Sequence, residues 1–168
     1  MAVLVKIAHF LYAMLFVLVA GVMWGTWLSL SRTMTHYDTT TFLADGQHMI
    51  DNLGTVMAVL MISTAVIGLV VVVALFMRRS AAAAWLAMIG LALLGAVLVV
   101  TLAVEVPIDN RIATWTVDTL PTDWMDIRAR WSDFHTLRTF LSLAGVAAVV
   151  AAALSYRPST RDESPTPN

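Results

Sequence analysis

Four apolar stretches, each long enough to cross a lipid bilayer, constrain the fold of this chain more than any other feature. They cover about residues 7–30, 53–77, 81–104 and 124–155, and the last one has a polar first half. A helix needs roughly 20 residues to cross the hydrocarbon core, where only helices or closed barrels satisfy the backbone. Because 60% of the residues are hydrophobic and only 12% are charged, lipid is the expected solvent. We therefore predict an all-α integral membrane four-helix up-and-down bundle with long outer connections.

The two ends of the chain have different compositions. The first apolar run is longer than the core of a signal peptide, and it carries Trp24 and Trp27 as interfacial anchors, so we expect it to be retained. The other end, residues 157–168, is rich in Pro, Ser, Thr and charge, which is typical of disorder. The sequence predicts one membrane domain, residues 1–156, followed by a disordered tail, residues 157–168.

A pair of arginines sets the expected orientation. Arg78 and Arg79 form a tight turn between the second and third stretches, and short connections with positive charge usually face the cytoplasm. We therefore expect a multi-pass protein of the cell membrane with both termini cytoplasmic. Nine of the eleven carboxylates then fall on the outer side, where the connections are about twenty residues long. Long connections on one side of a bundle are common places for binding and catalytic sites.

The fourth stretch carries a polar stripe. The residues follow one another at intervals of three or four, which keeps them on one helical face: Trp124, Arg128, Trp131, His135, Arg138 and Ser142. Ionisable groups at this depth are costly unless they face the bundle and find partners. We expect Arg138 to pair with Glu105 at the end of the third stretch. The alternative is purely structural: an ion pair between helices, a belt of tryptophans, and an arginine that reaches the lipid headgroups.

The segment after the third stretch, residues 105–125, is expected to roof an outward-facing pocket. Pro107 should end the helix and turn the chain over the mouth of the bundle, with Asp109 and Asn110 above the mouth and Trp115 dropping back towards it. A short helix should precede the second stretch and place His48 and Asn52 on the same side.

Bound groups and partners are only partly constrained. The chain has no cysteine, hence no thiolate metal site, and no basic patch that would indicate nucleic acid. We predict no metal and no other cofactor; the alternative is non-haem iron or copper at His48, Glu105 and His135. The lipid bilayer and a hydrophobic small molecule are the expected partners. The Gly21-xxx-Gly25 pattern permits a homo-oligomer.

Several segments together resemble the anthrone oxygenase-like family of small four-helix membrane proteins, much of which is catalogued as a domain of unknown function. The similar segments are "GTWLSLSRTM", "GQHMIDNLGTVMAVLM", "EVPIDNRIATW" and "DWMDIRARWSDFHTLRTFLSLAG", within residues 10–155. The most specific elements are Pro107–Asn110 and the spacing of Trp131, His135 and Arg138. The resemblance implies oxidation of polyketide anthrones to anthraquinones by O2, without an ordinary organic cofactor.

Such a reaction assigns roles to residues of the stripe. A base must remove an acidic proton, and an imidazole can titrate near neutrality, so His135 is the expected base. Arg138 or Arg128 would stabilise the oxyanion. The catalytic set is His135, Arg138 and Glu105. The substrate-binding set comprises residues that stack a flat ring or orient a carbonyl: His48, Asn52, Asn110, Trp115, Trp124, Arg128 and Trp131.

Two other functions stay open. The chain could be a non-catalytic subunit or scaffold of a larger membrane complex, or an oligomeric permease. A permease is less favoured, because the first three stretches carry almost no polar residue to line a path. An enzyme should enclose an apolar cavity with His135, Arg138 and Glu105 around its mouth, whereas a scaffold should pack these side chains solidly.

Overall fold

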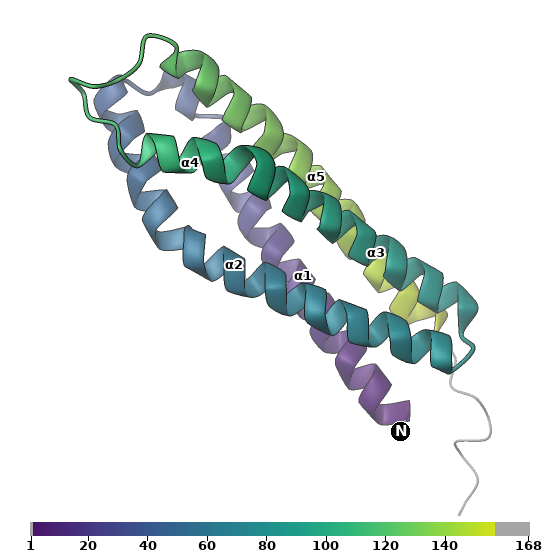
Figure 1. Ribbon diagram of the computed structural model, residues 1–168. Coiled ribbons are helices and arrows are strands. Elements are labelled where there is room, and N and C mark those ends of the chain that lie inside the picture. The colour runs from purple at the N-terminus through teal and green to yellow at the C-terminus, as the bar shows by residue number, and fades with distance from the viewer. Residues whose placement is uncertain (1, 157–168) are drawn as a thin grey trace, which may run out of the picture.

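Apolar helices make up the fold, as the composition predicts. The computed structural model describes residues 2–156; the tail predicted at 157–168 lies outside the described residues. The long helices are α1 (Ala2–Thr26), α2 (Thr39–Met77), α3 (Ala81–Val100) and α5 (Trp124–Ser155) (Figure 1). Four helical segments are long and apolar enough to span a membrane, which confirms the predicted all-α membrane bundle.

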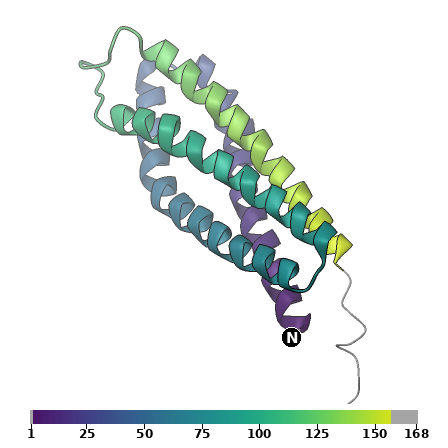
Figure 2. The ribbon, with the colours of Figure 1, turned by 45° about the vertical axis from the view of Figure 1, so that its right-hand side comes forward.

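The helices run alternately up and down. α1 packs against α2 and α5, and α3 packs against the same two helices, so the bundle closes as a ring. The N-terminus, the α2–α3 turn and the end of α5 lie at one end, and the connections at 32–38 and 113–123 lie at the other (Figures 1 and 2). We call the latter the connection end. In the α2–α3 turn, Arg79 adopts a left-handed conformation with φ 55°, which makes this connection very short.

The second helix starts earlier than the sequence indicated. We expected a short helix to precede the second span and run into it; in the structure the two form one helix, α2, continuous from Thr39 to Met77. Asp38 caps its start by accepting a hydrogen bond from the Thr41 amide at 2.7 Å. This hydrogen bond holds the pKa of the Asp38 carboxyl below its ordinary value. The first connection is therefore shorter than predicted.

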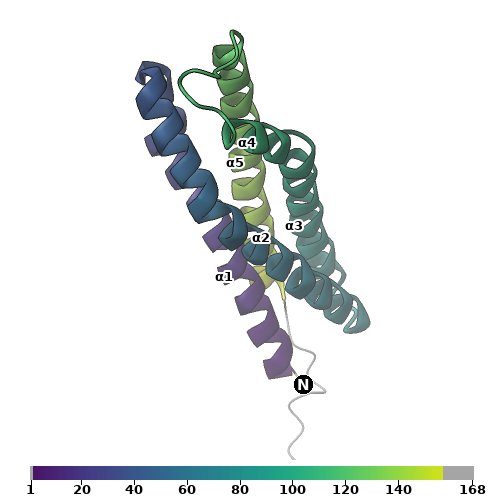
Figure 3. The ribbon, with the colours of Figure 1, turned by 60° about the vertical axis from the view of Figure 1, so that its left-hand side comes forward.

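The third span also extends beyond its predicted end. Pro107 does not end the helix: a π-helical turn, η3 (Thr101–Glu105), joins α3 to α4 (Val106–Ile112). In this turn the Val106 amide donates to the Thr101 carbonyl, five residues back. Such a wide turn accommodates a proline ring and redirects a helix without breaking it. Figure 3 shows α2 and α3 diverging from their turn, with α4 bent across the wide end.

Two clusters of buried side chains hold the bundle together. The larger one fills the half near the α2–α3 turn and includes Tyr12, Phe16, Leu75, Leu94 and Val149, all with no exposed area. The second, which we call the end cluster, closes the connection end; its buried members are Met34, Phe42, Leu43, Ile108, Ile112, Ile127 and Trp131. Between the two clusters the packing is incomplete.

The Gly21-xxx-Gly25 pattern is not used within the described chain. Both glycines are exposed on α1, and an added Cβ at either would meet nothing within 4 Å. A homo-oligomer through this face stays a prediction.

Candidate functional site

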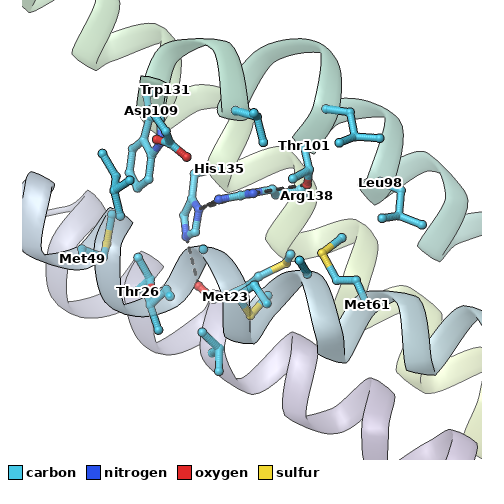
Figure 4. A pocket seen from close by; sticks show the side chains of 18 of the residues that line it. Met23, Thr26, Met49, Met61, Leu98, Thr101, Asp109, Trp131, His135 and Arg138 are labelled. Atoms are coloured by element: carbon cyan, nitrogen blue, oxygen red, sulfur yellow. Dashed lines mark hydrogen bonds between the residues drawn. The ribbon is translucent and has the colours of Figure 1, made fainter. Parts of the chain in front are cut away.

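A cavity of about 280 Å³ lies between α1, α2, the η3–α4 segment and α5. Most of its wall is apolar, formed by side chains such as Met23, Met49, Met61 and Leu98 (Figure 4). Polar groups gather at one side of this wall, from Asp109 through His135 and Arg138 to Thr101 (Figure 4), and Thr26 on α1 also lines the cavity. Mostly apolar walls with a few convergent polar groups are typical of small-molecule sites. An apolar cavity is therefore present, as predicted for an enzyme and not for a solidly packed scaffold, but His135 and Arg138 lie in its wall instead of around its mouth.

A buried ion pair supports this polar side. Nη2 of Arg138 lies 2.9 Å from Oε2 of Glu105, as the sequence led us to expect; the two side chains are 13% and 0% exposed. Within residues 2–156, neither carboxylate oxygen of Glu105 receives a hydrogen bond of good geometry. Glu105 does not line the cavity but lies behind Arg138, whose Nη1 also donates to Oγ1 of Thr101 at 3.3 Å. The pair thus fixes a cation in the cavity wall.

His135 is held at both ring nitrogens. Nε2 lies 3.1 Å from the Met23 carbonyl, and Nδ1 lies 3.0 Å from Nη2 and 3.3 Å from Nε of Arg138. Because a carbonyl can only accept and a guanidinium can only donate, these partners assign the proton to Nε2 and the lone pair to Nδ1. Figure 4 shows the imidazole between the two partners. A base needs a lone pair directed at the substrate, so this geometry favours a positioning role for His135 over the predicted role as base.

Asp109 presents a carboxylate to the cavity. Its Oδ1 accepts a hydrogen bond from the Trp131 indole at 2.9 Å, and the Trp131 ring stacks on His135 with centroids 4.8 Å apart. Trp131 and Asp109 lie side by side in Figure 4, and both line the cavity. Asp109 therefore combines a fixed orientation with access to a bound molecule.

The outer part of the predicted stripe belongs to the end cluster instead. Arg128 donates from Nη1 to the Met34 carbonyl at 2.8 Å, and its guanidinium lies 4.9 Å from the centre of the Trp124 ring. Trp115 packs against the same cluster, and none of these three side chains lines the cavity. The predicted lid at 105–125 needs a corresponding correction. α4 forms a wall of the cavity, whereas 113–123 does not touch it.

Three predicted binding residues lie outside the site. His48 and Asn52 are exposed on α2, and Asn110 is exposed on α4, and none of them lines the cavity. The assumed end of the helix at Pro107 placed Asn110 wrongly, because the helix continues and directs Asp109 inward instead. The alternative iron or copper site is not assembled either. Across residues 2–156, no three His, Asp or Glu side chains are grouped so that they could hold a metal ion.

The sequence reasoning missed two contributors to the site, Thr101 and the Met23 carbonyl, and it placed Asp109 above the mouth instead of in the cavity wall. Thr101 could have been found, since Thr101, Glu105 and Asp109 are spaced by four residues, which is typical of one face of a continuous helix. The contact of His135 with a backbone carbonyl of α1 has no signal in the sequence.

Comparison with known proteins adds a family. The family model described as anthrone oxygenase matches residues 52–157, more than half of the chain. No curated protein and no solved structure is significantly similar to this chain.

Proposed function

This chain belongs to the anthrone oxygenase family, and we propose that it oxidises a flat, hydrophobic, anthrone-like molecule with O2 in the cavity between its helices. The observation that carries the proposal is the polar side of an otherwise apolar cavity, where the Asp109 carboxylate and the Arg138 guanidinium both line the wall. A base and a cation beside an apolar space are what carbanion chemistry on an aromatic ketone requires.

The reaction begins with a proton transfer. Asp109 takes a proton from the ring methylene opposite the ketone, and the electron pair of the broken C–H bond moves into the ring system and onto the ketone oxygen. Arg138 stabilises the resulting oxyanion. His135 and Glu105 hold Arg138 in place, and the Trp131 indole holds Asp109.

The oxidation then follows from the electron-rich carbanion. It transfers electrons to O2 and forms a carbon–oxygen bond, which gives a hydroperoxide after protonation. Loss of the second methylene proton and cleavage of the O–O bond leave a new ketone and release water. One anthrone and one O2 give one anthraquinone and one water, so the balance needs no further oxidant. We propose that the reaction proceeds without a metal or organic cofactor.

The apolar wall contributes by excluding water. Charge interactions between Asp109, Arg138 and the developing oxyanion are stronger in an environment of low polarity than in water. We also propose that the protein resides in the cell membrane with both termini in the cytoplasm, because the short turn carries Arg78 and Arg79.

The test uses purified protein in lipid nanodiscs with anthrone and O2. We expect anthraquinone, followed by its absorbance, to appear with equimolar O2 uptake. Asp109→Asn should keep the hydrogen bond from Trp131 but lower kcat by about 10²–10⁴-fold, the usual contribution of a general base. Asp126→Asn, at an exposed carboxylate on α5, is the matched control and should leave kcat unchanged.

Separate results would contradict separate parts of this proposal. Wild-type protein that consumes no O2 with any anthrone would refute the oxygenase function. An Asp109→Asn variant as fast as wild type would refute the assignment of the base alone. Stoichiometric iron or copper in active protein would refute the absence of a cofactor.

A further inference from the structure

We propose that the cavity takes up its substrate sideways from the lipid bilayer, through a mouth between α2 and the η3–α4 segment. The inference rests on the proposed function for the identity of the substrate, but the position of the mouth is a property of the fold. It replaces the outward-facing pocket that the sequence predicted with one that opens towards the acyl chains.

Exposed apolar residues mark both sides of the mouth. On α2 the cavity is lined by Gly54, Ala58 and Ile62, which are all exposed, Ile62 to 60%. Opposite them lie Leu102 of η3 and Val106 of α4, which are 66% and 37% exposed. A residue that lines the cavity and is also exposed marks a place where the cavity opens. All five of these residues are apolar, so the opening has no group that would hold water.

The arrangement of the helices explains why the mouth is here. α2 and α3 diverge from the turn at 78–80, and α4 bends across their wide end (Figure 3). The side chain of Gln47 on α2 ties this end together, donating from Nε2 to the carbonyls of Ile112 and Trp115 at 3.0 and 2.9 Å. The helices are thus joined above and below the opening, and the space between them stays unfilled.

By contrast, packed side chains close the route from the aqueous side at the connection end to the cavity. The end cluster lies between the cavity and the connections, and it contains Phe42, Ile108 and Ile112, each at most 7% exposed. The Trp124 ring packs on Phe42 at 5.3 Å between centroids, and Arg128 covers both rings. A substrate arriving from the aqueous side would have to displace these packed side chains.

The chemistry of the substrate agrees with this route. A tricyclic aromatic ketone has a large apolar surface and dissolves in the bilayer rather than in water. An apolar mouth at membrane depth allows such a molecule to reach Asp109 and Arg138 without crossing water. O2 is also more soluble in hydrocarbon than in water, so both reactants arrive by the same path.

The first experiment locates the mouth without any substrate. Because the chain has no cysteine, a single nitroxide can be attached at Ala58→Cys on its rim. We expect this nitroxide in reconstituted protein to collide readily with O2, which concentrates in the bilayer, and rarely with a water-soluble nickel chelate. Val59→Cys, at a 59% exposed position on the same helix, is the control for lipid, and Thr119→Cys, in the exposed connection, is the control for water.

The second experiment narrows the mouth. An added Cβ at Gly54 meets nothing within 4 Å, so the backbone accepts a side chain there, and we expect Gly54→Leu to project into the opening. We expect kcat/KM for anthrone in nanodiscs to fall by about tenfold while kcat at saturation is retained, because uptake and not chemistry is slowed. Gly95→Leu is the matched control, since Gly95 is equally open but does not line the cavity, and it should behave as wild type.

The outcomes separate the mouth from the oxygenase function. A nitroxide at residue 58 that meets the nickel chelate as readily as the one at residue 119 would overturn the proposal, and so would one shielded from both reagents by another chain. Unchanged kcat/KM in Gly54→Leu would overturn the uptake route. A lipid-exposed nitroxide in a protein without any oxygenase activity would refute the proposed function while supporting the position of the mouth.

Discussion

The two halves of the bundle use glycine in opposite ways. Near the α2–α3 turn, Gly68, Gly90 and Gly145 bring helices into close contact: an added Cβ would lie 2.6 Å from Tyr12, 2.6 Å from Val149 and 2.3 Å from Phe16, respectively. Towards the connection end, Gly54 faces open space beside the cavity. The close-packed half provides rigidity, and the open half provides room for a molecule.

Polar groups are divided in the same way. In the close-packed half, His9 has a buried ring whose Nε2 lies 3.1 Å from the Val149 carbonyl. In the open half, Asp109, His135 and Arg138 converge on the cavity, and Glu105 supports them from behind. Buried polar groups in a membrane protein are costly, and their concentration beside the cavity indicates a role there rather than in the assembly of the bundle.

The largest expected effect on stability comes from the ion pair of the open half. Arg138→Met leaves the fully buried Glu105 carboxylate without its counterion, which should cost about 3–5 kcal/mol of unfolding free energy. The double variant Glu105→Gln/Arg138→Met removes both charges and should recover most of this loss. Thermal unfolding in detergent measures the stability of the single and the double variant, with Arg111→Met at an exposed position as the control. A double variant no more stable than Arg138→Met would contradict the pairing.

A smaller effect should distinguish the glycines of the two halves. Gly145→Ala forces a methyl group against the buried Phe16 ring and should cost about 1–3 kcal/mol, as overpacking of a close-packed core usually does. Gly54→Ala should be neutral or slightly stabilising, because the site is open and alanine favours the helix. The same unfolding measurement compares them. Equal losses at both positions would show that the two halves are packed alike.

The smallest effect concerns the edge of the open half, where Asp38 caps α2. Its pKa is lower in the folded protein because the Thr41 amide donates to the carboxylate, so the cap stabilises the fold above the ordinary carboxyl pKa. The contribution is lost as the pH falls through the lowered folded pKa. Asp38→Ala should therefore reduce the melting temperature slightly at neutral pH, and the difference from wild type should disappear in acid. Asp51→Ala, at an exposed position within the same helix, is the control for the loss of a carboxylate away from the cap.

Features that depend on the local pattern of apolar and charged residues could be predicted from the sequence. Features that depend on how a helix bends or continues could not. Long apolar runs predicted the four spans, and the need of Arg138 for an anion predicted its pairing with Glu105. The treatment of Pro107 as the end of a helix placed Asp109 above the mouth and not in the cavity wall, because a π-helical turn that absorbs a proline has no clear sequence signature.

The sequence also did not show that the polar stripe of α5 faces the cavity with one part and the end cluster with the other. All its residues share one helical face, as the spacing predicts, but whether that face meets a cavity or packed side chains depends on the neighbouring helices. Trp131, His135 and Arg138 face the cavity, whereas Trp124 and Arg128 face Phe42 and the first connection. The bend of α4 and the early start of α2 bring side chains of both helices into the end cluster, which closes the cavity towards the connection end.

The η3 turn also determines the directions in which the side chains of the following helix, α4, point. A π-helical turn accommodates one residue more than the α-helix around it, and each residue of an α-helix corresponds to a rotation of about 100°. If Thr101–Glu105 were regular α-helix with the same number of residues, α4 would be rotated by about 100° about its axis, which would carry Asp109 away from the cavity. This one turn therefore determines which side chains of α4 line the cavity.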